Sequence, residues 1–172
     1  MISRARRFSR AATLLLFALA GAHAGEGPPL PDGIANASYS GTEYGTVTLT
    51  DGVWEGEAWV EGGAARPRVG LAPDFLRRGD VDGDGADEAL VIVWQSSGGS
   101  GTFNYIALLD RVDGAWRNTA TTALGDRVRV TDATIGPQGV EVSVIEHDED
   151  DPACCPTRTA IRRYDTQLTP LP

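Results

Sequence analysis

The residues best suited to chemistry lie in one acidic stretch, Gly79 to Glu88. Its carboxylates recur at alternate positions, and Gly83 and Gly85 allow the positive φ angles of a tight turn. Ca²⁺ takes about six to eight oxygen ligands, which such a loop supplies from alternate side chains and a backbone carbonyl. We therefore predict a structural calcium site with the ligands Asp80, Asp82, Asp84, Ala86 (through its carbonyl) and Glu88.

The acidic stretch begins like an EF-hand loop but ends differently. An EF-hand ends on a bidentate Glu and continues into a helix, whereas here Val91 stands at the corresponding position, inside the apolar run 89–94. The D-x-[DN]-G-D-G pattern at residues 80–85 resembles the strand-flanked loop of FG-GAP and VCBS repeat proteins. That resemblance implies a calcium loop that caps a β-blade. This chain departs from the pattern in two respects: Glu88 stands where Asp is usual, and one copy of the loop is too few for a propeller.

A larger part of the chain resembles an uncharacterised family of exported bacterial proteins. The similarity covers the acidic loop through Trp94, residues 98–103 and residues 151–156. It implies one domain and no particular activity.

A second group with chemical potential is the adjacent pair Cys154 and Cys155. Neighbouring Cα atoms lie about 3.8 Å apart, closer than in a usual disulfide, but an oxidising compartment favours bridging. The sequence leaves three states open: a vicinal disulfide, two free thiols, and a bridge to another molecule or a soft metal. If the pair has a function, we expect a rigid platform under a ligand or a redox switch. The structural alternative is a stiff turn beside Pro152 and Pro156.

Two weaker candidates have plain structural interpretations. The acidic run 146–151, which contains His147, is predicted to be a solvated loop, with a second, looser cation site as the alternative. The larger aromatic residues are predicted to pack in the core or on the sheets, with a carbohydrate or peptide groove as the alternative. They are Trp54, Trp59, Trp94, Trp116, Tyr44, Tyr105 and Tyr164.

The first 24 residues have the pattern of a secretory signal peptide. Four arginines precede an apolar core from Ala11 to Ala20, and Ala22-His23-Ala24 forms an A-x-A cleavage motif. The apolar core is about ten residues long, which is too short to span a bilayer. We predict cleavage near Ala24, a periplasmic or secreted product, and no integral membrane segment after cleavage.

Charge and composition narrow the partners and the chemistry. The net charge of −9 becomes −13 when the four arginines are lost, which disfavours nucleic acid and anionic membranes as partners. Every basic residue is Arg, so lysine Schiff-base chemistry is excluded. Cleavage would leave His147 as the single histidine, which argues against histidine-rich zinc centres.

Hydrophobic alternation predicts an all-β fold with little helix. Residues 25–45, rich in Gly, Pro, Ser and Asn, predict a flexible lead-in, and residues 46–172 a single β-rich domain. Strand patterns separated by turn residues indicate about eight mostly antiparallel strands in a meander, sandwich or open barrel. We expect a hairpin across residues 46–61, turning at Asp51-Gly52. The run 89–94, apolar on both faces, is the expected central strand.

Three functions follow from these features. The favoured one is a non-enzymatic, calcium-stabilised exported domain that binds an unknown extracytoplasmic ligand or protein or has a structural role. The second is a redox- or ligand-responsive envelope protein that acts through Cys154 and Cys155. The third is a hydrolase with paired carboxylates, which would need two of them converging in a deep pocket.

Overall fold

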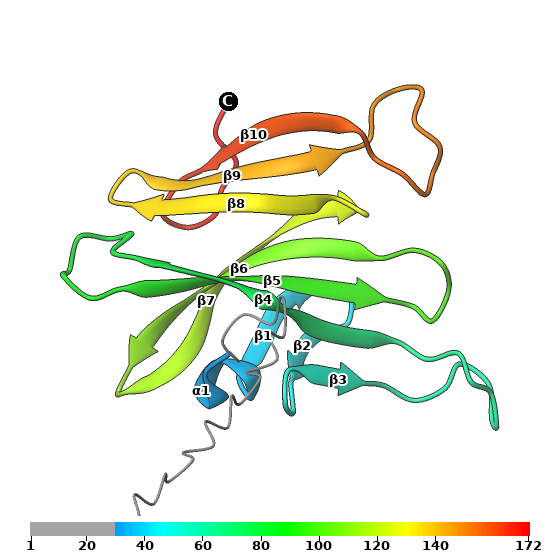
Figure 1. Cartoon of the computed structure of the whole chain (residues 1–172). Helices are drawn as coiled ribbons and strands as arrows, with labels where there is room; N and C mark the ends of the chain where they lie inside the picture. The colour runs from blue at the N-terminus through cyan, green and yellow to red at the C-terminus, as the bar shows by residue number, and fades with distance from the viewer. Residues whose placement is uncertain (1–29) are drawn as a thin grey trace, which may run out of the picture.

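The computed structural model describes residues 30–172, and the predicted signal peptide, residues 1–24, lies outside this range. Within it, one short helix precedes ten strands (Figure 1). The elements are α1 (Asp32–Ala35), β1 (Ser38–Thr42), β2 (Gly45–Thr48), β3 (Val53–Glu55), β4 (Arg68–Gly79), β5 (Glu88–Ser96), β6 (Phe103–Val112), β7 (Ala115–Asp126), β8 (Arg129–Gly136), β9 (Gly139–Glu146) and β10 (Arg158–Tyr164). The all-β prediction is confirmed, with ten strands in place of about eight.

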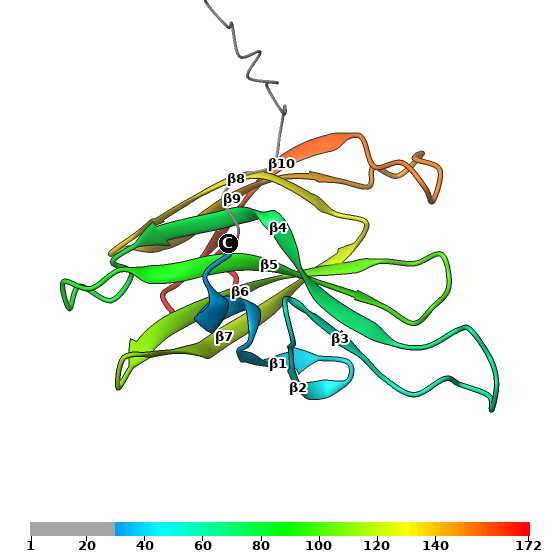
Figure 2. The ribbon, with the colours of Figure 1, turned by 60° about the horizontal axis from the view of Figure 1, so that its bottom comes forward.

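The strands form three antiparallel sheets. β1 pairs with β2, β3 to β7 form a five-stranded meander in chain order, and β8 to β10 form a three-stranded meander. The three-stranded sheet packs on one face of the central sheet, while α1, β1 and β2 pack on the other (Figures 1 and 2). The central sheet is therefore covered on both sides.

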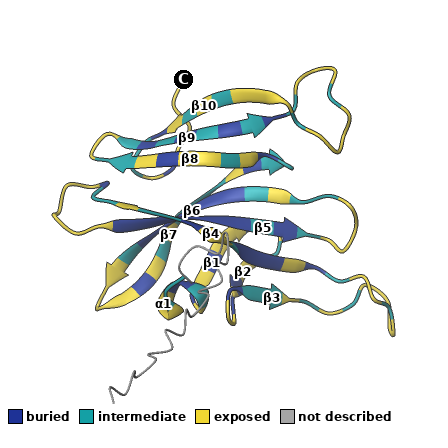
Figure 3. Cartoon of the chain, viewed as in Figure 1, coloured by how far each residue is buried: buried dark blue, intermediate teal, exposed yellow. Residues whose placement is uncertain are grey.

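β5 lies at the middle of this arrangement because it is apolar at every position from Ala89 to Val93. Ala89, Val91 and Val93 belong to the core shared with α1, β1 and β2, whereas Leu90 and Ile92 belong to the core shared with β8 and β9. Figure 3 shows β5 buried along most of its length. The prediction of a central strand covered on both faces is confirmed.

The prediction of a flexible lead-in is wrong for residues 30–45, the part of that segment that the structure describes. Ile34 and Tyr39 are fully buried, and the Tyr39 hydroxyl donates a hydrogen bond of 3.0 Å to the Ile34 carbonyl. The Ser40 N–H donates to Asn118 Oδ1 at 3.0 Å, which joins β1 to β7. A few well-placed apolar side chains order a segment whose average composition is polar.

The hairpin predicted across residues 46–61 is also wrong. β2 pairs with β1, and β3 pairs with β4. The turn at Asp51 and Gly52 is present, with φ angles of 50° and 82°. A bridge between Thr50 and Val53 crosses it, but the strands before and after it belong to different sheets.

An ion pair joins the central sheet to the three-stranded sheet. Arg77 of β4 donates to Asp132 Oδ1 of β8 from Nε at 3.1 Å and from Nη2 at 2.9 Å, and these bonds hold the pKa of the Asp132 carboxyl below its usual value. Nearby, a Cβ on Gly79 would lie 2.9 Å from the Ile135 carbonyl oxygen, so only glycine allows this approach. The end of β4, where the acidic loop begins, is thus fixed against β8.

Candidate metal centre

The acidic loop, residues 80–87, connects β4 to β5 at one end of the central sheet (Figure 1). Gly79 and Glu88 are paired in the antiparallel register, so the two strands close the loop at its base. Gly83 and Gly85 have φ angles of 82° and 89°, which side chains with a Cβ rarely adopt. The glycines thus have the role that the sequence predicts for them.

Within the loop the aspartates fold back onto backbone N–H groups. Asp80 Oδ1 accepts from Gly83 N at 2.6 Å, and Asp80 Oδ2 accepts from Gly85 N at 3.0 Å. Asp82 Oδ1 accepts from the N–H of Asp84 at 3.1 Å, and Asp84 Oδ1 accepts from the N–H of Ala86 at 2.7 Å. The loop is therefore held in a defined shape by its own carboxylates.

Glu88 differs from the aspartates because it is buried, with 2% of its surface exposed. Its Oε2 accepts a hydrogen bond of 2.7 Å from Val81 N, whereas Oε1 has no hydrogen-bond partner among the described residues. Burial raises the pKa of this carboxyl, and the negative charges of Asp82, Asp110 and Asp84 raise it further. A buried carboxylate oxygen without a partner is costly, so this position calls for a cation or a proton.

Three of the five predicted ligands come together. One carboxylate oxygen each from Asp80, Asp82 and Glu88 lie within 4.8 Å of one another. Asp84 belongs to the loop but lies outside this cluster, and the contact shown for Ala86 is made by its N–H and not by its carbonyl. A donor set made only of carboxylate oxygens suits a hard cation such as Ca²⁺.

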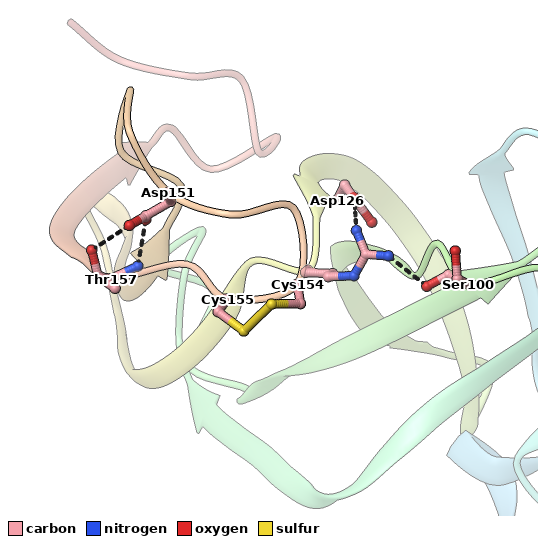
Figure 4. Close-up of a disulfide and its surroundings, with 7 residues drawn as sticks. Ser100, Asp126, Asp151, Cys154, Cys155 and Thr157 are labelled. Carbon is pink, nitrogen blue, oxygen red and sulfur yellow. Dashed lines mark hydrogen bonds and ion pairs between the residues drawn. A yellow bond between two sulfur atoms is a disulfide. The ribbon is translucent and has the colours of Figure 1, made fainter.

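The two cysteines are joined. A disulfide links Cys154 and Cys155, whose Cα atoms are 3.7 Å apart, and no free cysteine is present among residues 30–172. The pair lies in the exposed connection between β9 and β10 (Figure 4), and it lines one cavity with Arg127 of the turn between β7 and β8. Of the three states that the sequence leaves open, the structure has the vicinal disulfide.

The acidic run 146–151 has individual hydrogen-bonding roles. Glu146 forms ion pairs with Arg158 and Arg162 of β10. Asp151 accepts from the N–H of Asp148 at 2.8 Å and from the N–H and hydroxyl of Thr157 at 2.7 and 2.8 Å. The single cluster of three potential metal ligands found in residues 30–172 is the one in the acidic loop.

Most of the aromatic residues pack as predicted. Tyr105, Trp116 and Tyr164 are buried, and Tyr44 and Trp54 pack partly against the core shared with β1 and β2. Trp59 is the exception, with 58% of its surface exposed. Its indole N–H donates to the Ser97 carbonyl at 2.7 Å, which holds it across the neighbouring loop.

The cavities bear on the hydrolase hypothesis. Five surface cavities in the described part of the chain have volumes between about 250 and 630 Å³, and none is lined by two carboxylates. One of them places Asn104, Arg127 and Arg129 beside the disulfide. Sequence reasoning missed these three residues, because an Arg-rich strand pattern does not reveal which loop lies next to it.

No helix in residues 30–172 is long and apolar enough to cross a membrane. No protein-family model, curated protein or solved structure matches the chain. The function must therefore be argued from the site itself.

Proposed function

We propose that this chain is an exported β-domain stabilised by a calcium ion in the acidic loop, with a binding or structural role and no catalytic one. The observation that carries the proposal is the buried Glu88 carboxylate, whose Oε1 has no partner, beside Asp80 and Asp82. Three neighbouring carboxylates repel one another, and a divalent cation turns that repulsion into attraction.

The expected energy of this site is structural in scale. Extracellular calcium modules bind with Kd values of roughly 0.1 to 1 mM. At about 1 mM Ca²⁺ and a Kd near 0.1 mM, binding adds about 1.4 kcal/mol to the free energy of unfolding. The ion would fix the loop that leads into β5, and β5 carries the two cores.

Export is supported by two features. The first 24 residues have the signal-peptide pattern. The exposed disulfide between Cys154 and Cys155 fits an oxidising compartment outside the cytoplasm.

Calorimetric titration of the purified protein with CaCl₂ tests the proposal. We expect one site in the wild type and at least about tenfold weaker binding in Glu88→Gln, which removes the buried charge and keeps the shape. Asp87→Asn is the matched control, since Asp87 is an exposed carboxylate of the same loop outside the cluster. A titration with MgCl₂ tests selectivity, and weaker binding is expected because Mg²⁺ gives up its water reluctantly.

Two outcomes would refute the calcium site. One is the absence of binding heat in the wild type together with an unchanged melting temperature. The other is equal affinity in Glu88→Gln and the wild type. Circular dichroism of the variant without calcium separates loss of binding from loss of fold, and we expect the fold to persist because the substitution removes an unpaired buried charge.

A further inference from the structure

A second group of side chains that could bind a ligand lies at the end of the molecule opposite the acidic loop. Three connections meet there: residues 97–102 between β5 and β6, the turn between β7 and β8, and residues 147–157 between β9 and β10 (Figures 1 and 2). An open cavity of about 410 Å³ lies at this end, and its lining residues come from β6, from β8 and from two of these connections: Asn104, Arg127, Arg129, Cys154, Cys155 and Pro156. This volume lies within the range of about 300 to 1,000 Å³ that is typical of small-ligand sites.

Arg127 is held in place at this cavity by hydrogen bonds from its backbone and from its guanidinium group. Its backbone has φ 51°, and its N–H donates to the Thr102 carbonyl at 2.7 Å. Its guanidinium pairs with Asp126 through Nη1 and donates to the Ser100 carbonyl from Nη2 at 2.6 Å (Figure 4). A side chain fixed in this way loses little further freedom when it binds an anion.

Arg129 carries the charge that is not compensated. Within residues 30–172 its guanidinium has no ion pair and no hydrogen bond, and no carboxylate is among the residues that line the cavity. The cavity wall therefore carries two guanidinium groups, one of them paired with Asp126, whereas the acidic residues 148–151 of the neighbouring connection do not line it. A cavity wall with two arginines and no carboxylate favours an anion.

Asn104 adds a polar group of defined orientation. Its Nδ2 donates to the Val128 carbonyl at 2.7 Å, which leaves the amide oxygen as a hydrogen-bond acceptor. An acceptor beside two arginines suits a ligand that has hydroxyl groups as well as a negative charge.

The disulfide adds little to the stability of the fold, but it gives the cavity an apolar surface. Joining adjacent residues closes almost no loop, so it restricts the unfolded chain very little. The connection is instead ordered by Asp151, which accepts from Thr157 (Figure 4). Asp151 also accepts from the N–H of Asp148, and Cys155 N donates to the Pro152 carbonyl at 2.9 Å. Both cysteines are exposed, and polarisable sulfur makes favourable contacts with aromatic rings.

We propose that this cavity binds a small ligand with a carboxylate on a six-membered ring, the anion held by Arg127 and Arg129 and the ring packed on the Cys154–Cys155 disulfide. The planar guanidinium group matches a carboxylate, and charge-assisted hydrogen bonds of this kind are the strong ones. The cavity is separate from the acidic loop, so this proposal does not depend on calcium binding.

Binding is measured by calorimetry and by ligand-observed NMR, in calcium and again in chelator. Glucuronate and benzoate are the two charged probes, and they distinguish a sugar acid from an aromatic acid. Glucose and benzyl alcohol are their uncharged counterparts, and acetate is the anion without a ring. We expect at least one charged ring to bind, its uncharged counterpart to bind at least about tenfold more weakly, and acetate to bind more weakly as well.

Variants assign the binding to the residues. Arg129→Gln should weaken the charged ring at least about tenfold, because it removes an unpaired cation. Arg117→Gln is the matched control, an exposed arginine of β7 that does not line this cavity. The double variant Cys154→Ser with Cys155→Ser should reduce affinity for the charged ring to that for acetate, while circular dichroism confirms the fold.

The proposal is overturned by any of three results. The first is that neither glucuronate nor benzoate binds the wild type. The second is that uncharged and charged rings bind equally. The third is that Arg129→Gln or the double serine variant binds as tightly as the wild type.

Discussion

The backbone N–H of Val81 donates a 2.7 Å hydrogen bond to Glu88 Oε2, linking the first turn of the acidic loop to the first residue of β5. Val81 and Glu88 are both buried, each with 2% of its surface exposed. The acidic loop is therefore anchored in the core at a carboxylate that also faces Asp80 and Asp82. A cation bound there would act directly on the packing of the central strand.

The ion pairs between Glu146 of β9 and two arginines of β10 give a first prediction. Glu146 is buried and accepts from Arg158 Nη2 at 2.6 Å and from Arg162 Nε at 2.9 Å. Glu146→Gln leaves two arginines with a neutral partner, and we expect a loss of about 2 kcal/mol in the free energy of unfolding, below the full value for a buried pair because both arginines are partly exposed. Urea denaturation measures this loss.

Glu141→Gln is the matched control for that experiment. Glu141 pairs with Arg163 on the same two strands, but the two side chains are about half exposed, with 43% and 57% of their surface accessible. Its loss should cost less than about 1 kcal/mol. Equal losses in the two variants would show that burial of Glu146 has no effect on the strength of its ion pairs.

The polar contact between β5 and the N-terminal segment gives a second prediction. Gln95 is 1% exposed, its Oε1 accepts from the Glu43 N–H at 3.0 Å, and its Nε2 donates to Glu43 Oε2 at 2.7 Å. Gln95→Leu removes the partner of that N–H and should destabilise the fold by about 1 to 3 kcal/mol. Gln138→Leu, at an exposed turn, is the control. A Gln95→Leu variant as stable as wild type would mean that this contact does not hold the segment in place.

The connection between β9 and β10, which contains the disulfide, gives a third prediction, on how stability depends on pH. Hydrogen bonds from Asp148 N and Thr157 lower the pKa of Asp151 below its ordinary value of 3.8. A carboxyl whose pKa is lower in the folded state stabilises the protein above the unfolded value and loses that effect as the pH falls through the folded value. Asp151→Asn should therefore lower the melting temperature at neutral pH, and the difference from wild type should shrink below pH 3.8.

Thermal melts of both proteins across the acid range measure this difference. Because Asn keeps one acceptor oxygen, the charge is the main quantity removed. A constant difference at every pH would assign the effect to shape and not to ionisation.

Local patterns predicted the centre of the fold well. The apolar run 89–94 identified β5 as a doubly covered strand, because burial on both faces leaves no polar position. The turn predicted at Asp51-Gly52 is present, with positive φ angles at both residues. The spacing of the acidic loop identified Asp80, Asp82 and Glu88, which the fold brings together.

Contacts between distant segments could not be predicted in the same way. Residues 30–45 are polar on average, and their order depends on Asn118 and Gln95, which are far away in sequence. The cavity at the disulfide combines residues of β6, of β8 and of two connections, and no periodicity within one strand reports that proximity. Sequence patterns thus gave the candidate metal ligands within one loop and the cysteine pair, and missed Asn104, Arg127 and Arg129, which the tertiary fold places beside that pair.

The melting temperature with and without calcium tests the central claim most directly. With about 1.4 kcal/mol from calcium at about 1 mM, a domain of this size should melt about 4 °C higher in calcium than in chelator. Glu88→Gln should show no such rise, and Asp87→Asn should retain most of it. A wild-type melting temperature that is the same in calcium and in chelator would contradict the account.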